Sequence, residues 1–352
     1  MKILFLYANL QGSGHYRCIY PGRALERLGH RVRFAERLEI MADTSMPLDL
    51  EHDVYVFQLS QDESALRCMR ALGEAGKVRV YEVDDYYHAI PYYNPSSSSF
   101  RGKASEKLEV MEECMREADA VTVTTPELAE KYSRFNPMTF PLPNCVDLTD
   151  PAWRAAHPRR DGEVVVGWAG SPTHVEDFRL VVSTLERLCR KYPRVRIAVG
   201  GPADVFALLE GIPAEQKIFF PPVGFKEYPS MLAKFDVGLV PLADNEFNRC
   251  KSELKGLEYS CLGIPVLASP LPSYMRLIKD GENGFLCDNP REWFGKLSFL
   301  VENEDARSDM GSKARQMASA RAAEETASFW EGIFMALVAR KQLAASLSAR
   351  NN

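Results

Sequence analysis

Residues Asn248–Ser269 read NRCKSELKGLEYSCLGIPVLAS, and the segment DVGLVPL lies just before them at Asp236–Leu242. The apolar, partly β-branched character of Asp236–Leu242 predicts a short strand, which Pro241 ends. A polar loop with capping residues follows, and helical spacing then runs over Lys251–Cys261 until a glycine and a proline end it. The stretch therefore predicts a strand, a loop, a helix and a second strand, in the alternation typical of an α/β protein.

Three charged side chains fall on one face of this predicted helix. Lys251, Lys255 and Glu258 are separated by four and three positions, which brings them together on a helix surface. Two cations near a helix N-terminus favour a phosphate-bearing ligand, because the free backbone N–H groups add partial positive charge there. A carboxylate one turn further along can accept hydrogen bonds from sugar hydroxyls, including those of a ribose. A solvated helix face is the alternative explanation for the spacing by itself.

This segment resembles the donor-binding segment of the GT-B glycosyltransferases, specifically the retaining family 4 type (glycosyl transferases group 1). In that family a helix ending in Glu leads to a small-x-Gly-x-Pro-Val segment, matched here by Glu258 and by CLGIPVLAS at Cys261–Ser269. The sequence LIKDGENGFLC at Leu277–Cys287 resembles a turn-rich dG.nGfl stretch of the same family. The resemblance is strong over Asp236–Asp288 and diffuse in the rest of the chain.

One position departs from the family pattern. The family commonly has a second Glu eight residues before the position of Glu258, and this chain has Cys250 there. Asp244, Glu246 and Glu253 are the candidates for the sugar-hydroxyl role of that missing carboxylate, and the sequence leaves the three open.

The composition is that of an ordinary soluble globular protein. The chain has 352 residues, 46% of them hydrophobic and 26% charged, and a formal net charge of −5. This length suffices for two domains, and the acidic balance argues against nucleic acid as the main partner. No apolar run reaches the roughly 18 residues that span a bilayer, and the eight dispersed cysteines favour reduced thiols over a zinc site or a disulfide framework. We predict a cytoplasmic protein with at most peripheral contact with the inner face of a membrane.

A glycine-containing loop, NLQGSGHY at Asn9–Tyr16, joins the expected strand Lys2–Ala8 to the helix expected over Arg17–Leu28. Such a loop lets the backbone approach an anionic or polar ligand closely. The dinucleotide fingerprint G-x-G-x-x-G is the competing interpretation, but Arg17 replaces its third glycine and no acidic residue closes the second strand. In GT-B enzymes this loop faces the interdomain cleft. The resemblance therefore implies that four residues border the cleft: Gly12, Gly14, His15 and Arg17, with a histidine bonded only to local backbone as the alternative for His15.

Two adjacent carboxylates, Asp84 and Asp85, follow the expected strand Lys77–Val83. The carboxyl ends of strands are where open α/β sheets bind ligands. Many family 4 members carry a His near the position of Asp84, which implies that Asp84 or Asp85 orients sugar hydroxyls or helps to deprotonate the acceptor, with His88 as a neighbouring substitute. A divalent metal and a helix cap are the alternative roles. We expect no metal, because no third ligand is apparent and the GT-B fold usually works without one.

The strand–loop–helix pattern restarts in the second half, where the expected strand Glu163–Ala169 leads into GSPTH at Gly170–His174. In family 4 the matching loop usually supplies an Arg and a Lys to the donor diphosphate, and this chain has Trp168 and His174 near those positions. Hydroxyl groups and the helix N-terminus remain as hydrogen-bond donors to the phosphate. The donor-binding side chains that we expect are Ser171, Thr173, His174, Lys251, Lys255, Glu258 and Glu246.

We predict an α/β protein of the GT-B class, in which two Rossmann-like, doubly wound domains face a cleft. The N-terminal, acceptor-side domain is expected over residues 1–150, together with a C-terminal helix over about residues 322–347 that crosses back to it. A charged, proline-rich linker is expected over residues 151–162, followed by the nucleotide-sugar-binding domain over residues 163–321.

The resemblance implies a hexosyltransferase-like, metal-independent glycosyltransferase of polysaccharide biosynthesis. It would move a sugar from a nucleoside-diphosphate donor to a hydroxyl of a glycan or lipid-linked glycan, with retention and without a cofactor. The expected catalytic residues are Asp84, Asp85, Lys251 and Lys255. A nucleotide-sugar 2-epimerase on the same fold and a catalytically silent sugar-nucleotide-binding protein are the alternatives.

Overall fold

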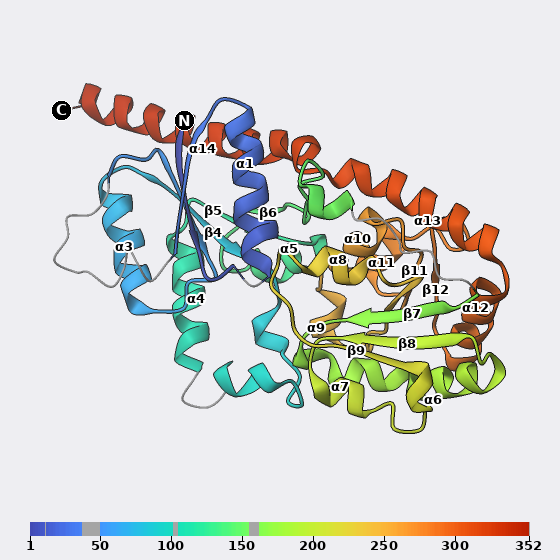
Figure 1. The fold of residues 1–352 in the computed structure, drawn as a ribbon. Helices are drawn as coiled ribbons and strands as arrows, with labels where there is room; N and C mark the ends of the chain where they lie inside the picture. The colour runs from blue at the N-terminus through green and yellow to red at the C-terminus, as the bar shows by residue number, and fades with distance from the viewer. Residues whose placement is uncertain (11, 37–49, 101–104, 155–161, 352) are drawn as a thin grey trace.

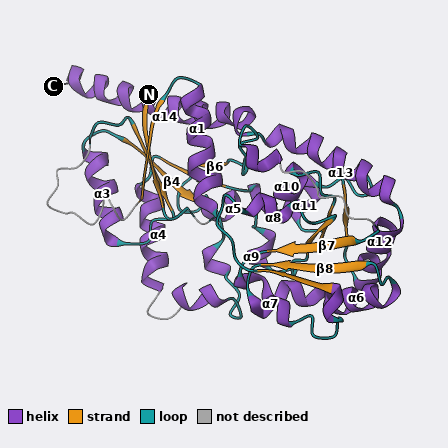
Figure 2. Cartoon of the chain, viewed as in Figure 1, coloured by secondary structure: helices purple, strands orange, loops and turns teal. Residues whose placement is uncertain are grey.

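The computed structural model describes residues 1–10, 12–36, 50–100, 105–154 and 162–351, and these residues form two α/β lobes (Figures 1 and 2). Each lobe contains a parallel sheet of six strands. The first sheet consists of β1 (Lys2–Tyr7), β2 (Arg31–Glu36), β3 (Val54–Gln58), β4 (Val78–Val83), β5 (Ala120–Val123) and β6 (Thr139–Pro141). The second consists of β7 (Val164–Ala169), β8 (Val195–Gly200), β9 (Lys217–Phe220), β10 (Val237–Val240), β11 (Val266–Ala268) and β12 (Gly284–Leu286).

Helices cover both sheets, which is why several strands are buried over their whole length. The first lobe contains α1 (Tyr20–Arg27), α3 (Glu63–Glu74), α4 (Glu106–Glu117) and α5 (Pro126–Tyr132). The second contains α6 (Val175–Lys191), α7 (Ala203–Ala207), α8 (Tyr228–Leu232), α9 (Glu246–Arg249), α10 (Leu254–Cys261), α11 (Pro272–Leu277), α12 (Pro290–Glu302) and α13 (Glu304–Ala318). None of the described helices is long and apolar enough to cross a membrane.

The strand orders show where each sheet can bind a ligand. The first sheet runs β2-β1-β3-β4-β5-β6 and the second β12-β11-β10-β7-β8-β9. In both sheets the direction in which strands are added reverses beside the first strand, between β1 and β3 and between β7 and β10. Open parallel sheets bind ligands outside the carboxyl ends of their strands at such reversal points.

The last helix, α14 (Ala323–Asn351), follows the second lobe in sequence but packs against the first. Its Trp330 and Phe334 are buried in one cluster with Ile3 and Phe5 of β1, and the rings of Phe5 and Trp330 are 6.2 Å apart. Figure 1 shows α14 alongside α1 at the outer side of the first sheet. The predicted helix that returns to the N-terminal domain is thereby confirmed. The predicted domain boundaries stay predictions, and residues 155–161 of the predicted linker lie outside the described residues.

The helix predicted over Lys251–Cys261 differs from the observed elements, because the segment forms two short helices. The side chain of Asn245 accepts a hydrogen bond from the backbone N–H of Asn248 and starts α9 early. Phe247 and Cys250 are then buried in the core of the first lobe, which turns the chain before α10 begins at Leu254. Lys251 consequently lies in the turn between α9 and α10.

One other predicted segment differs in the first lobe. The helix expected from Arg17 begins earlier, as a π-helical turn at His15–Ile19 that continues into α1. The aromatic- and serine-rich segment Tyr86–Phe100, which follows β4, contains two 3-10 helical stretches. Its Tyr86, Ile90 and Phe100 are buried in the core of the first lobe, because an aromatic-rich loop gains apolar burial by packing there.

Arg17 lies inside the first lobe rather than at the cleft border where the resemblance placed it. Its side chain is fully buried, and its Nε is 2.6 Å from a carboxylate oxygen of Glu82 on β4. Its Nη1 donates to the carbonyl of Leu142 at 2.6 Å, and the guanidinium lies over the ring of Trp330. Arg17 therefore has a structural role, because it forms an ion pair with a buried carboxylate inside this lobe.

Replacing Arg17 with Ala is expected to lower the free energy of unfolding of the first lobe by about 3–5 kcal/mol, because Glu82 keeps its burial and loses its cation. Burial raises the pKa of Glu82 to about 7 even though Arg17 opposes the shift. Below that pH, Glu82 is protonated in the folded wild type and no longer depends on the cation of Arg17. The stability lost in Arg17→Ala should therefore be smaller at pH 5.5 than at pH 8.

Urea denaturation at the two pH values measures this loss. Arg70→Ala removes an exposed pair with Glu117 and serves as the control, with an expected change within about 1 kcal/mol. A loss for Arg17→Ala no larger than that of the control at pH 8 would contradict the structural role of Arg17.

Candidate active site

A cavity of about 880 Å³ lies between the two lobes at the carboxyl ends of the strands. Its walls come from the loops that follow β1, β4, β7, β8, β9 and β10, together with the start of α10. These loops include both reversal points of the strand order. The cavity is therefore where two facing open α/β sheets are expected to bind a common ligand.

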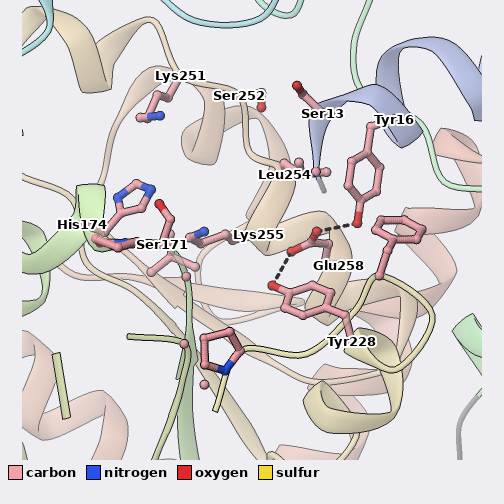
Figure 3. A pocket seen from close by; sticks show the side chains of 18 of the residues that line it. Ser13, Tyr16, Ser171, His174, Tyr228, Lys251, Ser252, Leu254, Lys255 and Glu258 are labelled. Atoms are coloured by element: carbon pink, nitrogen blue, oxygen red, sulfur yellow. Dashed lines mark hydrogen bonds between the residues drawn. The ribbon is translucent and has the colours of Figure 1, made fainter. Parts of the chain in front are cut away.

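Lys255 projects into this cavity from the first turns of α10 (Figure 3). Burial is the largest influence on its ammonium group and lowers the pKa of Lys255. The loop after β7 passes close to it, since a Cβ at Gly170 would lie 3.3 Å from Cε of Lys255 and 2.6 Å from the ring of Trp168. The described residues provide no carboxylate within 4.0 Å of its Nζ, so Lys255 is a half-buried cation that an anionic ligand would stabilise.

Lys251 forms an ion pair across the cleft with Asp85. Its Nζ is 2.9 Å from Oδ2 of Asp85 and lies over the ring of Phe247 at 4.5 Å from the centroid. Asp84, the neighbouring carboxylate, accepts a hydrogen bond from the Tyr87 hydroxyl at 3.2 Å. Burial raises the pKa of Asp84, the charge of Asp85 adds to this shift, and Lys251 opposes it. Asp84 and Asp85, which we predicted to be catalytic, therefore interact electrostatically with Lys251, which we predicted to bind phosphate.

Glu258 lies one turn beyond Lys255 and is held by two tyrosines (Figure 3). The hydroxyl of Tyr16, from the first lobe, donates to Oε1 at 2.5 Å, and that of Tyr228, from α8, donates to Oε2 at 3.1 Å. Burial raises the pKa of Glu258, and Lys255 and the two hydroxyls oppose the shift. Each carboxylate oxygen has a second lone pair, so Glu258 can still accept a hydrogen bond from a ligand hydroxyl.

His174 ends the loop after β7 and is oriented by Asp177 in the first turn of α6. Its Nδ1 is 2.8 Å from Oδ2 of Asp177. The other oxygen of Asp177 accepts from the backbone N–H of Ala243 and from the side-chain amide of Asn248, both at 2.9 Å. Asp177 therefore joins the loop after β7 to the loop after β10, and it fixes the imidazole at the cavity wall.

The structure brings together most, but not all, of the residues that the sequence analysis assigned to the site. Those that line the cavity are Gly12, Asp84, Asp85, Ser171, His174, Lys251, Lys255 and Glu258. Thr173 and Gly14 lie next to lining residues: the Thr173 hydroxyl is 2.6 Å from that of Ser171, and the backbone at Gly14 packs closely on the carbonyl of Asn9. His15 stacks on Phe225 with ring centroids 3.6 Å apart, and Phe225 itself lines the cavity.

Besides Arg17, two expected site residues lie elsewhere. His88 packs under α4, with Nε2 3.1 Å from Glu112 and its ring against Phe135. Glu246 is exposed on α9 and pairs with Lys131 at 2.7 Å. Both have partners distant in sequence, which the local pattern did not reveal.

The position of the missing second Glu lies outside the cavity as well. Cys250 is buried in the core of the first lobe, and its carbonyl accepts a hydrogen bond from the Thr125 hydroxyl at 2.9 Å. The other candidates for the missing role are also engaged: Asp244 pairs with Arg249 at the surface, and Glu253 pairs with Arg321. The acidic side chains that line the cavity are instead Asp84, Asp85 and Glu258.

The sequence analysis missed three residues that shape the site: Tyr16, Tyr228 and Asp177. Tyr16 ends the glycine-containing loop, and its place beside predicted cleft residues was a usable signal. Asp177 stands three residues after His174 at a helix start, a spacing that brings two side chains together. Tyr228 gave no signal, because its contact with Glu258 depends on how α8 packs against α10.

Comparison with known proteins locates a family domain in the second lobe. Residues 163–303 match the family model described as "Glycosyl transferases group 1". The chain contains a glycosyl transferases group 1 domain. Two D-inositol 3-phosphate glycosyltransferases are similar to part of the chain: that of Paenarthrobacter aurescens (strain TC1) is 31% identical over 128 residues, and that of Nocardioides sp. (strain ATCC BAA-499 / JS614) is 30% identical over 111 residues.

These two matches cover 34% and 31% of the chain, and 30% and 23% of the relatives. The matched part therefore spans less than a third of the length of these curated relatives. The group 1 domain includes the loop of His174, both lysines and Glu258, whereas Asp84, Asp85 and Tyr16 lie outside it.

Solved structures are similar over nearly the whole chain. HepE of Anabaena in complex with UDP has a TM-score of 0.65 at 16% identity, with 99% of this chain and 100% of that chain covered. Sucrose-phosphate synthase of Thermosynechococcus elongatus has a TM-score of 0.71 at 14% identity, with 97% and 100% covered. At these identities the likeness concerns the fold, and it confirms the predicted GT-B architecture of two Rossmann-like domains facing a cleft.

Replacing Lys255 with Met is expected to stabilise the protein when no ligand is added, because it removes a partly desolvated charge that has no carboxylate within ion-pair distance among the described residues. The thermal unfolding midpoint should rise by about 1–2 °C, the shift for about 1 kcal/mol in a chain of 352 residues. The same variant should lose most of the stabilisation that a nucleoside diphosphate gives the wild type.

Differential scanning fluorimetry with and without ligand measures both effects. Lys313→Met, which removes a surface pair with Asp309, is the matched control and should change neither quantity. A lower midpoint for ligand-free Lys255→Met would show that Lys255 stabilises the fold, and it would remove the argument for an anion site here.

Proposed function

We propose that the protein is a glycosyltransferase that moves a hexose-like sugar from a nucleoside-diphosphate donor to a hydroxyl of a glycan or lipid-linked glycan, with retention. The observation that carries the proposal is the arrangement on α10, where a half-buried cation, Lys255, and a buried carboxylate, Glu258, enter one interdomain cavity a single turn apart. The proposal includes a cytoplasmic reaction that needs neither a metal nor another cofactor.

The donor diphosphate is proposed to bind between Lys255 and the loop after β7. Lys255 supplies the charge, while the Ser171 hydroxyl and the backbone N–H groups at the start of α6 supply hydrogen bonds. Glu258 accepts hydrogen bonds from the ribose, with Tyr16 and Tyr228 holding the carboxylate in place. HepE of Anabaena is described in complex with UDP and with UDP-glucose, which supports uridine donors as the first ligands to test.

Lys251 has to exchange partners for this scheme to work. In the ligand-free protein its ammonium group is paired with Asp85. A diphosphate carries more negative charge than one carboxylate, so its arrival draws Lys251 towards the leaving group and releases Asp85. The freed carboxylate can then orient a hydroxyl of the sugar or of the acceptor, beside Asp84.

The transfer itself needs charge stabilisation more than a protein nucleophile. The acceptor oxygen forms a bond to the anomeric carbon on the face that the diphosphate leaves, the bond from that carbon to the phosphate oxygen breaks, and the acceptor proton passes to that phosphate oxygen. Negative charge therefore develops on the diphosphate, where half-buried cations such as Lys255 stabilise it. Asp84 and Asp85 are proposed to align the acceptor hydroxyl for this step.

The two alternatives are not favoured. A group 1 domain and glycosyltransferase relatives support a transferase over a nucleotide-sugar 2-epimerase or a catalytically silent binding protein. Product analysis separates the three outcomes directly, since they give a new glycoside, an epimerised donor or an unchanged donor.

The experiment that tests the function has two steps. A thermal-shift panel of UDP, GDP, ADP and dTDP should identify one nucleotide, because a ligand at 100 times its Kd stabilises a protein by about 2.7 kcal/mol. Sugar esters of that nucleotide are then incubated with lipid-linked and soluble glycan acceptors, and mass spectrometry and NMR report the product and its anomeric configuration. Absence of nucleotide binding, or a product with inverted configuration, would count against the proposal.

The substitution Asp84→Asn should lower kcat at least tenfold, which corresponds to about 1.4 kcal/mol of transition-state stabilisation. Nucleotide affinity should stay within twofold of the wild type, because the partner of Asp84 is the sugar or the acceptor. Asp288→Asn, at an exposed position, is the matched control and should leave both quantities unchanged. Activity that disappears with EDTA and returns with Mn²⁺ would instead assign the two aspartates to a metal site.

A further inference from the structure

The imidazole of His174 has one nitrogen fixed and one facing the cavity. Its side chain is 10% exposed, and His174 lines the cavity beside Ser171 and Lys255 (Figure 3). Nδ1 makes the hydrogen bond to Asp177, while no described residue occupies Nε2. The protein therefore presents Nε2 to whatever binds in the cavity.

The hydrogen bonds of Asp177 decide whether Nε2 of His174 donates or accepts a hydrogen bond. Oδ1 of Asp177 already accepts from two N–H donors, those of Ala243 and Asn248, so this group acts as a carboxylate acceptor. A carboxylate oxygen cannot donate, which requires that Nδ1 of His174 carries the hydrogen. In the neutral imidazole the other nitrogen, Nε2, is then an acceptor.

The charges around His174 keep the ring neutral. Burial is the largest cause and lowers the pKa of His174 to about 4, with Lys255 and then Lys251 acting in the same direction. Asp177 is the group that opposes the shift. These groups come from α6, from the turn before α10 and from α10 itself. A neutral ring has little to offer a phosphate oxygen, which is an acceptor too.

We propose that Nε2 of His174 accepts a hydrogen bond from a hydroxyl of the transferred sugar, and that Asp177 is the positioning residue that fixes this polarity. The inference rests on the proposed function and deepens it. The sequence predicted His174 as a donor-binding residue, and the proposal specifies the sugar as the part of the donor that it contacts. The diphosphate is left to Lys255, Lys251 and the backbone N–H groups, while His174 distinguishes a nucleotide that carries a sugar from one that does not.

The position of His174 favours the donor sugar over the acceptor as its hydrogen-bond partner. His174 belongs to the loop after β7, on the same lobe as Ser171, Lys255 and Glu258. Asp84 and Asp85, which belong to the other lobe, are the residues proposed to align the acceptor hydroxyl. A group on the donor side meets the sugar before the acceptor enters.

The test compares two kinds of ligand, with and without a sugar, in two variants. The ligands are the nucleoside diphosphate selected by the panel and its glucose, galactose and N-acetylglucosamine esters, with Kd measured by calorimetry. His174→Ala removes the acceptor. Asp177→Asn keeps an oxygen for Ala243 and Asn248 but turns the group towards His174 into a donor, so that Nδ1 must accept and Nε2 must carry the hydrogen. Glu176→Gln, an exposed carboxylate one residue earlier, is the matched control.

Both variants should weaken the sugar ester by about three- to tenfold, the effect of one neutral hydrogen bond, and should leave the bare diphosphate within twofold of the wild type. A merely structural role of Asp177 would weaken both ligands together and would overturn the inference. So would diphosphate binding that tightens below pH 6 in the wild type but not in His174→Ala, since this would assign a charged imidazole to the phosphate. If His174→Ala left the binding of both kinds of ligand unchanged and raised the KM for the acceptor, His174 would contact the acceptor, and the inference would be wrong.

Failure of the proposed function gives a different result. In that case the wild type itself binds neither the diphosphate nor any of the esters, and the inference falls with it.

Discussion

The burial of Phe247 and Cys250 in the core of the first lobe is the constraint on which the cavity depends. These residues belong to the second lobe in sequence, yet they are part of the buried apolar cluster of the first lobe, where α9 contacts the 3-10 turn Tyr87–Ala89. Their burial places the next residues at the floor of the cleft, where Lys251 meets Asp85 and Ser252 accepts from the side-chain amide of Asn144 at 2.8 Å. Each of these contacts joins the two lobes. The positions of the site residues therefore depend on the closed arrangement of the cleft.

The same closure explains why the ionisable groups of the cavity are shifted towards their neutral forms. Burial lowers the pKa values of Lys255 and His174 and raises those of Asp84 and Glu258. A closed, ligand-free cavity therefore holds charges at a cost, which polar partners such as Tyr16 and Tyr228 offset only in part. Under the proposed function, a diphosphate that carries a sugar recovers part of that cost on binding, because its charge and its hydroxyls complement Lys255 and Glu258.

The sequence was sufficient for the fold and for the placement of Lys255 and Glu258 on one helix, for physical reasons that are local. Alternating strand and helix patterns predict two open α/β sheets, and the spacing of Lys255 and Glu258 on one helix predicts their joint projection into the cavity. The local pattern failed where a contact joins distant segments. Arg17 pairs with Glu82, 65 positions away, and the break before α10 arises from the burial of Phe247 in another lobe, so neither is encoded in a short stretch.

The replacement of the second family Glu by Cys250 follows from the same packing. At this position the side chain lies among apolar residues of the first lobe, where an ionised carboxylate would cost several kcal/mol unless it were paired. A cysteine packs there as a small apolar group, and it allows α9 to sit deeply against the first lobe. The carboxylates that face the cavity then come from the end of β4, as Asp84 and Asp85. Under the proposed function, the acidic groups near the reacting sugar are thus contributed by the acceptor-side lobe, and catalysis requires the two lobes to be closed.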